Sequence, residues 1–226
     1  MIQAVVFDLD GVMINSEVLS FKAWQDILKP YGIELTEVDY ARIIGMDLET
    51  SNRFMLETTG IPLDMPALQQ EMAQTFMAYV ENELEPMPGL EELVAALVER
   101  NIPIAVASNS PGDYVLYTLE LIGIRDKLQA VVAREQVALG KPAPDVYLEA
   151  ASQLVVSPGN CLAVEDTPIG LQAALAAGMV SVAVAAEAPW EAGFKDAHAR
   201  FRSLVELRES LDSLLVGNHS NGADLR

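Results

Sequence analysis

The chain has 226 residues, 51% of them hydrophobic and 21% charged, and a formal net charge of −19 at pH 7. This length and composition are typical of a soluble globular protein with one large domain or two smaller ones. So much negative charge disfavours nucleic acids and anionic membranes as partners, and an anionic ligand would need a local cation in its site.

The chain contains a single cysteine, Cys161, so no intrachain disulfide is possible. The apolar residues after it favour a buried core thiol over a nucleophile. No apolar run reaches the length of a membrane span, and a strand pattern stands at the N-terminus in place of a signal peptide. These features predict a cytoplasmic protein that binds no membrane.

The first predicted element is the apolar run Ala4–Phe7, which is typical of a buried central strand. Helical segments, such as residues 89–100, 113–122 and 169–177, lie between later runs of the same kind. Strands that alternate with helices predict parallel pairing through right-handed crossovers. We therefore expect an α/β fold with a doubly wound parallel sheet of at least five strands, at residues 4–7, 102–107, 130–133, 161–164 and 181–185.

Residues between the first two predicted strands show helical patterns only. They predict helices at 18–31, 36–44, 48–59 and 64–84, and the apolar residues of the first helix, among them Trp24, indicate a core of its own. We expect residues 16–85 to form a small helical domain inserted into a larger one.

The larger domain would comprise residues 1–15 and 86–226. Two prolines and a glycine at 86–89 suit a linker that sets a hinge direction, so the inserted domain could act as a lid. The polar segment 217–226 is expected to be a frayed tail.

Two aspartates follow the first strand directly. Asp8 and Asp10 lie at its carboxyl end, where open α/β sheets bind ligands, and Gly11 allows a sharp turn after them. Two neighbouring carboxylates can hold a divalent cation, and one of them can attack an electrophile. Taken alone, the pair fits solvated acids at a strand end equally well.

Polar residues follow the second predicted strand as well. Ser108 and Asn109 can donate hydrogen bonds to an anion, although a residue here can also cap the next helix.

Lys141 lies in a restrained Gly-Lys-Pro segment and is the natural local cation, although a lone lysine is more often a surface residue.

Glu165 and Asp166 follow the strand predicted at 161–164. Two acids at a strand end suit a hard cation, although Asp166 or Thr167 could simply cap the following helix. Four polar signals thus converge on one edge of the predicted sheet, which favours a functional site there.

In order and spacing, four segments resemble the motifs of the haloacid dehalogenase superfamily: Phe7–Val12, Ser108–Asn109, Lys141–Pro142 and Glu165–Asp166. The resemblance covers nearly the whole chain, and the helical insertion is similar to a type I cap. The chain most resembles the group of β-phosphoglucomutases and phosphoglycolate phosphatases. This resemblance implies a Rossmann-like core, Mg²⁺ as cofactor and a small phosphorylated metabolite as substrate. We expect a monomer or a weak homodimer.

The resemblance also implies a role for each motif residue. Asp8 would attack phosphorus and form an aspartyl-phosphate, while Asp10 would act first as acid and then as base. Mg²⁺ would bind Asp8, the backbone carbonyl of Asp10 and Asp166, with Glu165 close by. The phosphoryl oxygens would be bound by Gly11, Ser108, Asn109 and Lys141, which fits a reaction governed by positioning and charge neutralisation.

Hydrolysis of a small phosphate monoester, of the sugar, polyol or glycolate type, is the favoured reaction. Asp10 argues against a dehalogenase, which lacks this second aspartate. A β-phosphoglucomutase would carry a histidine where this chain has Ser20 and an arginine where it has Leu48. Such a mutase stays an alternative, as does a non-catalytic phosphate-sensing protein on the same fold.

The loop of Gly45, Met46 and Asp47 in the helical domain is expected to recognise the substrate, with Met46 and Asp47 pointing inward. Asp47 would suit a substrate that carries hydroxyl groups. An N-cap for the helix that starts at Leu48 is an equally good interpretation of Asp47.

Overall fold

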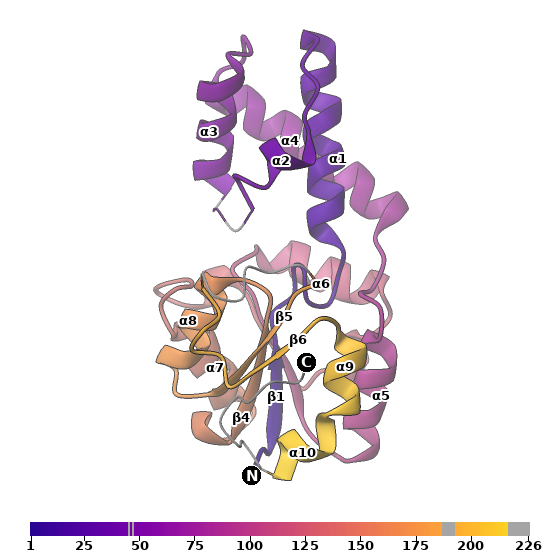
Figure 1. Cartoon of the computed structure of the whole chain (residues 1–226), viewed down its shortest axis with the longest axis vertical. Helices are drawn as coiled ribbons and strands as arrows, with labels where there is room; N and C mark the ends of the chain where they lie inside the picture. The colour runs from indigo at the N-terminus through magenta and orange to yellow at the C-terminus, as the bar shows by residue number, and fades with distance from the viewer. Residues whose placement is uncertain (45, 47, 187–192, 217–226) are drawn as a thin grey trace. The chain divides into compact units, whose positions relative to one another are not determined.

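The computed structural model describes residues 1–44, 46, 48–186 and 193–216. They form two compact units (Figure 1). One, which we call the core, consists of Met1–Ile14 and the residues from Pro86 onward. The other, which we call the helical unit, is Asn15–Glu85. The predicted tail, residues 217–226, lies outside the described residues.

The core is built on a six-stranded parallel sheet with the order β3-β2-β1-β4-β5-β6. Its strands are β1 Ala4–Phe7, β2 Ile104–Ala107, β3 Ala130–Val132, β4 Cys161–Glu165, β5 Val180–Val184 and β6 Ala199–Phe201. The predicted doubly wound parallel sheet is thereby confirmed, and its five predicted strands begin and end within two residues of the observed ones. The sixth strand, β6, was not predicted.

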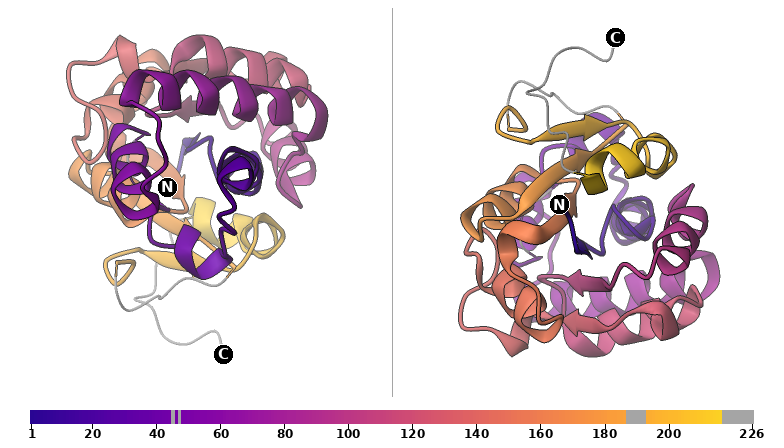
Figure 2. Two further views of the ribbon diagram at one scale, coloured as in Figure 1. Left: turned by 90° about the horizontal axis from the view of Figure 1, so that it is seen from above. Right: turned by 90° about the horizontal axis from the view of Figure 1, so that it is seen from below.

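Strand β1 lies inside the sheet and pairs with β2 on one side and β4 on the other. Figure 2 shows the molecule from below on the right, with the N-terminus, which leads into β1, near the middle of the view. From β1 the sheet continues through β2 to β3, whereas from β4 it continues through β5 to β6 in the opposite direction. The strand order therefore reverses between β1 and β4, and open α/β sheets bind ligands beyond the carboxyl ends of the strands at such a point.

Helices cover both faces of the sheet. Helices α7 (Asp145–Gln153) and α8 (Pro168–Ala176) lie on one face, and α5 (Leu90–Glu99), α9 (Leu204–Glu209) and α10 (Leu211–Val216) lie on the other (Figure 1). Another core helix, α6, spans Gly112–Leu121, and short 3₁₀ turns are found at Arg125–Lys127, Arg134–Gln136 and Pro158–Asn160.

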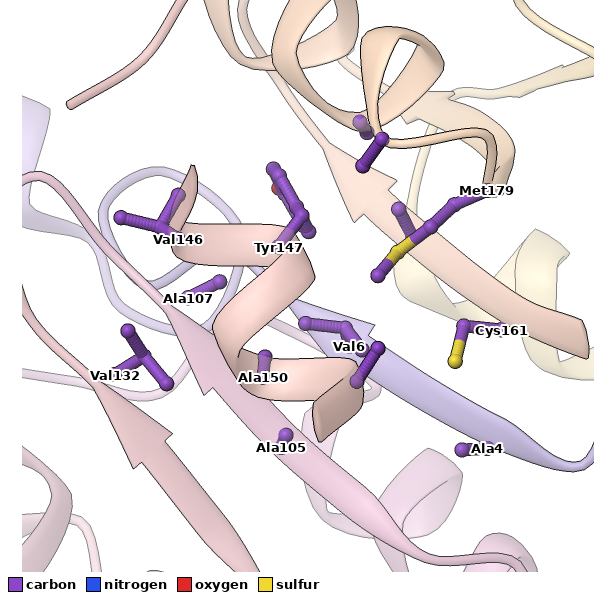
Figure 3. Packing of buried hydrophobic residues seen from close by; sticks show 14 of the residues in the cluster. Ala4, Val6, Ala105, Ala107, Val132, Val146, Tyr147, Ala150, Cys161 and Met179 are labelled. Carbon is purple, nitrogen blue, oxygen red and sulfur yellow. The ribbon is translucent and has the colours of Figure 1, made fainter. Parts of the chain in front are cut away.

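Small side chains allow α7 to approach the sheet closely. Figure 3 shows Val146, Tyr147 and Ala150 of this helix above Ala105 and Ala107 of β2. Cys161 is fully buried in the same cluster, as predicted for a core thiol. These contacts fix α7 over strands β1, β2 and β3, and its first turn reaches the end of β4 through Tyr147 and Glu165.

The helical unit consists of α1 Ser16–Leu28, a 3₁₀ turn at Lys29–Tyr31, α2 Glu37–Tyr40, α3 Leu48–Thr59 and α4 Met65–Glu83. Trp24, 1% exposed, lies in an apolar cluster that also contains Ile27, Leu68 and Met72, so its predicted place in a core is confirmed.

The predicted helix 36–44 is wrong in length, because α2 ends at Tyr40. After it, Arg42 N donates to Asp39 O at 3.3 Å and Ile43 N to Tyr40 O at 2.9 Å. These bonds to the third preceding residue are the bonds of tight turns rather than of an α-helix.

The chain passes between the two units twice, and in each unit the two connecting segments are hydrogen-bonded to each other. In the core, Met87 N donates to Met13 O at 2.9 Å, next to a bridge between Ile14 and Pro86. In the helical unit, Asn15 N donates to Glu85 O at 3.2 Å, and Glu85 N donates to Asn15 Oδ1 at 3.0 Å. Among the described residues, no helix is both long and apolar enough to cross a bilayer.

Candidate active site

The motif residues of the core lie at one edge of the sheet. Asp8 extends β1, since its N–H donates to Val164 O of β4 at 3.0 Å. Ser108 extends β2, since its N–H donates to Val132 O at 2.9 Å, and Glu165 is the last residue of β4. The predicted site residues of the first and last motifs therefore meet at the point where the strand order reverses.

Lys141 is buried against two carboxylates. Its Nζ contacts Asp8 Oδ1 and lies 2.7 Å from Glu165 Oε1. The side chains of Lys141 and Glu165 are 5% and 1% exposed. The alternative that Lys141 is an ordinary surface lysine is therefore wrong.

The Asn109 side chain fixes the backbone of Lys141. Lys141 N donates to Asn109 Oδ1 at 2.8 Å, and Asn109 Nδ2 donates to Lys141 O at 3.2 Å. The Lys141–Pro142 peptide bond that follows is cis. The Asn109 amide thus places the lysine, a function that the spacing of the motifs did not reveal.

Ser108 does not cap α6, so that alternative is wrong. It is 1% exposed, and its Oγ accepts a hydrogen bond from Ser110 N at 3.0 Å. The first N–H of the helix, Gly112 N, instead donates to Glu135 Oε1 at 2.7 Å. A hydroxyl that accepts one bond can still donate another, so Ser108 keeps the capacity to donate to an anion.

Three acids form a cluster suited to a metal ion. Asp8, Glu165 and Asp166 each offer a carboxylate oxygen, and these atoms lie within 4.8 Å of one another. Gly11, at a φ of 77°, leaves room for Asp166, because a Cβ on this residue would lie 2.0 Å from Asp166 Oδ2. The N-cap of α8 is Thr167, whose hydroxyl accepts from Gly170 N at 3.2 Å, so capping does not occupy Asp166.

The site carries more negative than positive charge. Burial has the largest effect on the pKa of Asp8 and raises it, Lys141 lowers it, and the nearby Glu165 and Asp10 raise it. The net result is a rise of the pKa from 3.8 to about 7. For Lys141, burial alone would lower the pKa, but Asp8 and Glu165 outweigh it and the net effect is a rise. Oxygen ligands and surplus negative charge are what Mg²⁺ requires, so these residues fit that ion.

Tyr147 of α7 belongs to the site but was not predicted. Its hydroxyl donates to Glu165 Oε1, and its ring centroid lies 5.0 Å from Lys141 Nζ. The residue is fully buried, and burial followed by the charge of Glu165 raises its pKa. Tyr147 therefore fixes the carboxylate that binds Lys141. The one signal in the sequence is that a buried tyrosine needs a partner for its hydroxyl.

Asp10 is bound from the side of α6. Its Oδ2 accepts a hydrogen bond from Ser110 Oγ at 2.7 Å, and its Oδ1 accepts one from the Tyr114 hydroxyl at 2.9 Å. Tyr114 was also missed in the sequence, since nothing local connects it with a residue 104 positions away.

The predicted substrate loop belongs to the helical unit. Met46 is 40% exposed, whereas Gly45 and Asp47 lie outside the described residues. Leu48 begins α3 and is 59% exposed, and Ser20 lies on α1.

Comparison with known proteins identifies the family. Residues 5–184 match the haloacid dehalogenase-like hydrolases. The chain belongs to this family. It is 32% identical over 180 residues to the fructose-1-phosphate phosphatase YqaB of Escherichia coli (strain K12), covering 80% of this chain and 95% of that protein. It is also 33% identical over 190 residues to the β-phosphoglucomutase of Bacillus subtilis (strain 168), covering 80% of this chain and 83% of that one.

Solved structures support the same assignment. A HAD family hydrolase from Deinococcus radiodurans R1, determined with bound phosphate and sodium, superposes with a TM-score of 0.80 at 26% identity. The match covers 94% of this chain and 96% of that one. The resemblance inferred from the motifs is thereby confirmed over most of the chain.

Proposed function

We propose that this protein is a Mg²⁺-dependent phosphatase that hydrolyses a small phosphate monoester through an aspartyl-phosphate on Asp8. The observation that carries the proposal is the contact of Asp8 with the buried Lys141, beside Glu165 and Asp166, at the switch point of the sheet. Phosphoryl transfer depends on placing a nucleophile and on neutralising the phosphoryl oxygens, and this arrangement serves both needs.

In the first step, an Asp8 oxygen attacks phosphorus, and the bond from phosphorus to the substrate oxygen breaks. Asp10 gives its proton to that leaving oxygen. In the second step, a water attacks phosphorus and loses a proton to Asp10, and the bond between phosphorus and Asp8 breaks. Inorganic phosphate leaves, and both aspartates return to their starting forms.

Lys141 keeps Asp8 from repelling an anionic substrate, and Ser108 can donate a hydrogen bond to the phosphoryl group. Mg²⁺, bound by Asp8, Asp166 and the backbone carbonyl of Asp10 with Glu165 close by, would supply further neutralisation of those oxygens. Asp8 attacks only when ionised, and a bound cation favours that form.

We place the substrate among the phosphates of sugars and polyols, with glycolate-type phosphates as the remaining class. The similarity to a fructose-1-phosphate phosphatase supports this choice. The helical unit would serve as the type I cap, with Gly45, Met46 and Asp47 selecting the substrate. The protein would act in the cytoplasm as a monomer or a weak homodimer.

A second candidate is a phosphosugar mutase of the β-phosphoglucomutase type. The similarity to the Bacillus subtilis mutase favours it. Ser20 and Leu48 oppose it, because they replace the histidine and arginine expected of that group. Incubation with β-glucose 1-phosphate and a bisphosphate primer separates the two: a mutase forms glucose 6-phosphate faster than free phosphate.

The proposal is tested by measuring phosphate release from the purified full chain. Fructose 1-phosphate, a hexitol 6-phosphate, phosphoglycolate and p-nitrophenyl phosphate are each offered with Mg²⁺ and with EDTA. We expect release with Mg²⁺, fastest from a sugar or polyol phosphate, and its loss in EDTA with recovery when Mg²⁺ is restored. Absence of turnover with every substrate, or turnover unaffected by EDTA, would contradict the proposal.

A further inference from the structure

The Asp10 side chain is held by two hydroxyl groups from one short segment. Each of its carboxylate oxygens accepts one bond, from Ser110 at 2.7 Å and from Tyr114 at 2.9 Å. A carboxylate bonded at both oxygens cannot turn about its own axis without losing a bond. Its plane and direction are therefore fixed by Ser110 and Tyr114 together.

Both donors are themselves well placed. Ser110 is bonded through its backbone on two sides, since its N–H donates to Ser108 Oγ at 3.0 Å and its carbonyl accepts from Arg134 N at 3.2 Å. Tyr114 lies in the first turn of α6 and is partly buried. A tyrosine has few rotatable bonds, so a hydroxyl on a helix is a precise donor.

We propose that Ser110 and Tyr114 are positioning residues that set Asp10 for proton transfer to the leaving group. This inference rests on the proposed function, in which Asp10 is the acid and then the base. An acid–base group works only within hydrogen-bond reach of the atom it protonates, and small displacements are costly. The two hydroxyls supply that placement.

The effect of a misplaced Asp10 depends on the leaving group of the substrate. The alkoxide of a sugar or polyol is a poor leaving group and needs the proton of Asp10 as it departs. p-Nitrophenolate is a good leaving group and departs without a proton. Because kcat/KM covers the steps up to the first irreversible one, it reports on the transfer to Asp8. A misplaced Asp10 therefore lowers kcat/KM for the sugar phosphate far more than for p-nitrophenyl phosphate.

The test compares Tyr114→Phe with Tyr117→Phe. Both tyrosines are on α6, but Tyr117 is 38% exposed and its hydroxyl has no hydrogen-bond partner among the described residues. We expect Tyr114→Phe to lower kcat/KM for fructose 1-phosphate by about tenfold or more, and that for p-nitrophenyl phosphate by less than about threefold. KM should stay nearly constant, and Tyr117→Phe should change neither value.

Further variants make the test independent of folding. Ser110→Ala should reproduce the difference between the substrates, and Ser110→Thr, which keeps a hydroxyl, should restore most of the loss. In an Asp10→Asn background, Tyr114→Phe should have no further effect on the sugar phosphate.

Equal losses for both substrates, or no loss in Tyr114→Phe and Ser110→Ala, would overturn the positioning role. Failure of the proposed function gives a different result, because the unmodified protein would then release no phosphate from either substrate with Mg²⁺.

Discussion

Among the described residues, buried ion pairs are found in the core but not in the helical unit. In the core, Lys141 and Glu165 are 5% and 1% exposed and lie 2.7 Å apart. In the helical unit, the pair Lys22–Glu83 is 40% and 44% exposed, and Arg53–Glu49 is 60% and 66% exposed. Among the described residues, the acids close enough to share a metal ion are all in the core.

The buried charges of the core mark the place of the chemistry. Exposed ion pairs contribute about 0–1 kcal/mol, so those of the helical unit can be exchanged at little cost. Buried charges are costly unless each is paired, so the core holds its charged cluster only because the cluster has a use or a compensating ion. The helical unit is instead built by apolar packing around Trp24, which leaves its surface open to change.

The largest difference in kcat is expected between substitutions of two lysines, one in each unit. Lys141→Ala removes the cation that faces Asp8 and should lower kcat by about 100- to 1000-fold, as loss of a charge-stabilising donor does. Lys22→Ala in the helical unit removes an exposed ion pair and a contact with the Tyr79 ring, and should change kcat by less than about twofold. Steady-state phosphate release measures both. Comparable losses in the two variants would refute the difference between the units.

A smaller difference, in the Mg²⁺ dependence of activity, is expected between substitutions of two glycines with similar backbone conformations. Gly11 has a φ of 77° and Gly60 a φ of 66°, but a Cβ on Gly11 would lie 2.0 Å from Asp166 Oδ2, whereas one on Gly60 would meet nothing within 4 Å. Gly11→Ala must displace Asp166, so the Mg²⁺ concentration for half-maximal activity should rise by about tenfold or more.

Gly60→Ala serves as the control for backbone strain. It should lower Tm through backbone strain alone and leave the Mg²⁺ dependence unchanged. A normal Mg²⁺ dependence in Gly11→Ala would mean that Asp166 does not bind the ion.

The pH dependence of stability should also differ between the units. In metal-free protein the pKa of Asp8 is about 7, against 3.8 in the unfolded chain. Between pH 4 and 7 the folded state binds more protons, so the free energy of unfolding falls as pH rises, by up to about 1.4 kcal/mol per pH unit. Asp8→Asn removes this loss, so its Tm advantage over the unmodified protein, measured in EDTA, should be larger at pH 8 than at pH 5.

Asp39→Asn in the helical unit is the matched control. Asp39 lies at the surface on α2, so its replacement should shift Tm equally at pH 5 and pH 8. If the Tm advantage of Asp8→Asn does not grow with pH, folding does not raise the pKa of Asp8.

The sequence was most informative where local pattern and chemistry coincide. Asp8 and Glu165 follow apolar runs that are typical of buried strands, so their meeting at one edge could be predicted. Strand β6 could not, because three residues with an exposed arginine in the middle show no strand pattern. The partners of Asp10 and Glu165 were also hidden, since Tyr114 and Tyr147 are brought to them by the packing of α6 and α7 rather than by spacing.

On the proposed mechanism, Asp8 carries the phosphoryl group during turnover. Borohydride quenching of the enzyme while it turns over fructose 1-phosphate with Mg²⁺, followed by peptide mass spectrometry, detects this intermediate. Borohydride reduces an acyl phosphate to an alcohol, so we expect homoserine at position 8, and unmodified Asp8 when substrate is left out. Rapid turnover with no modification at position 8, or full activity in Asp8→Asn, would contradict the account.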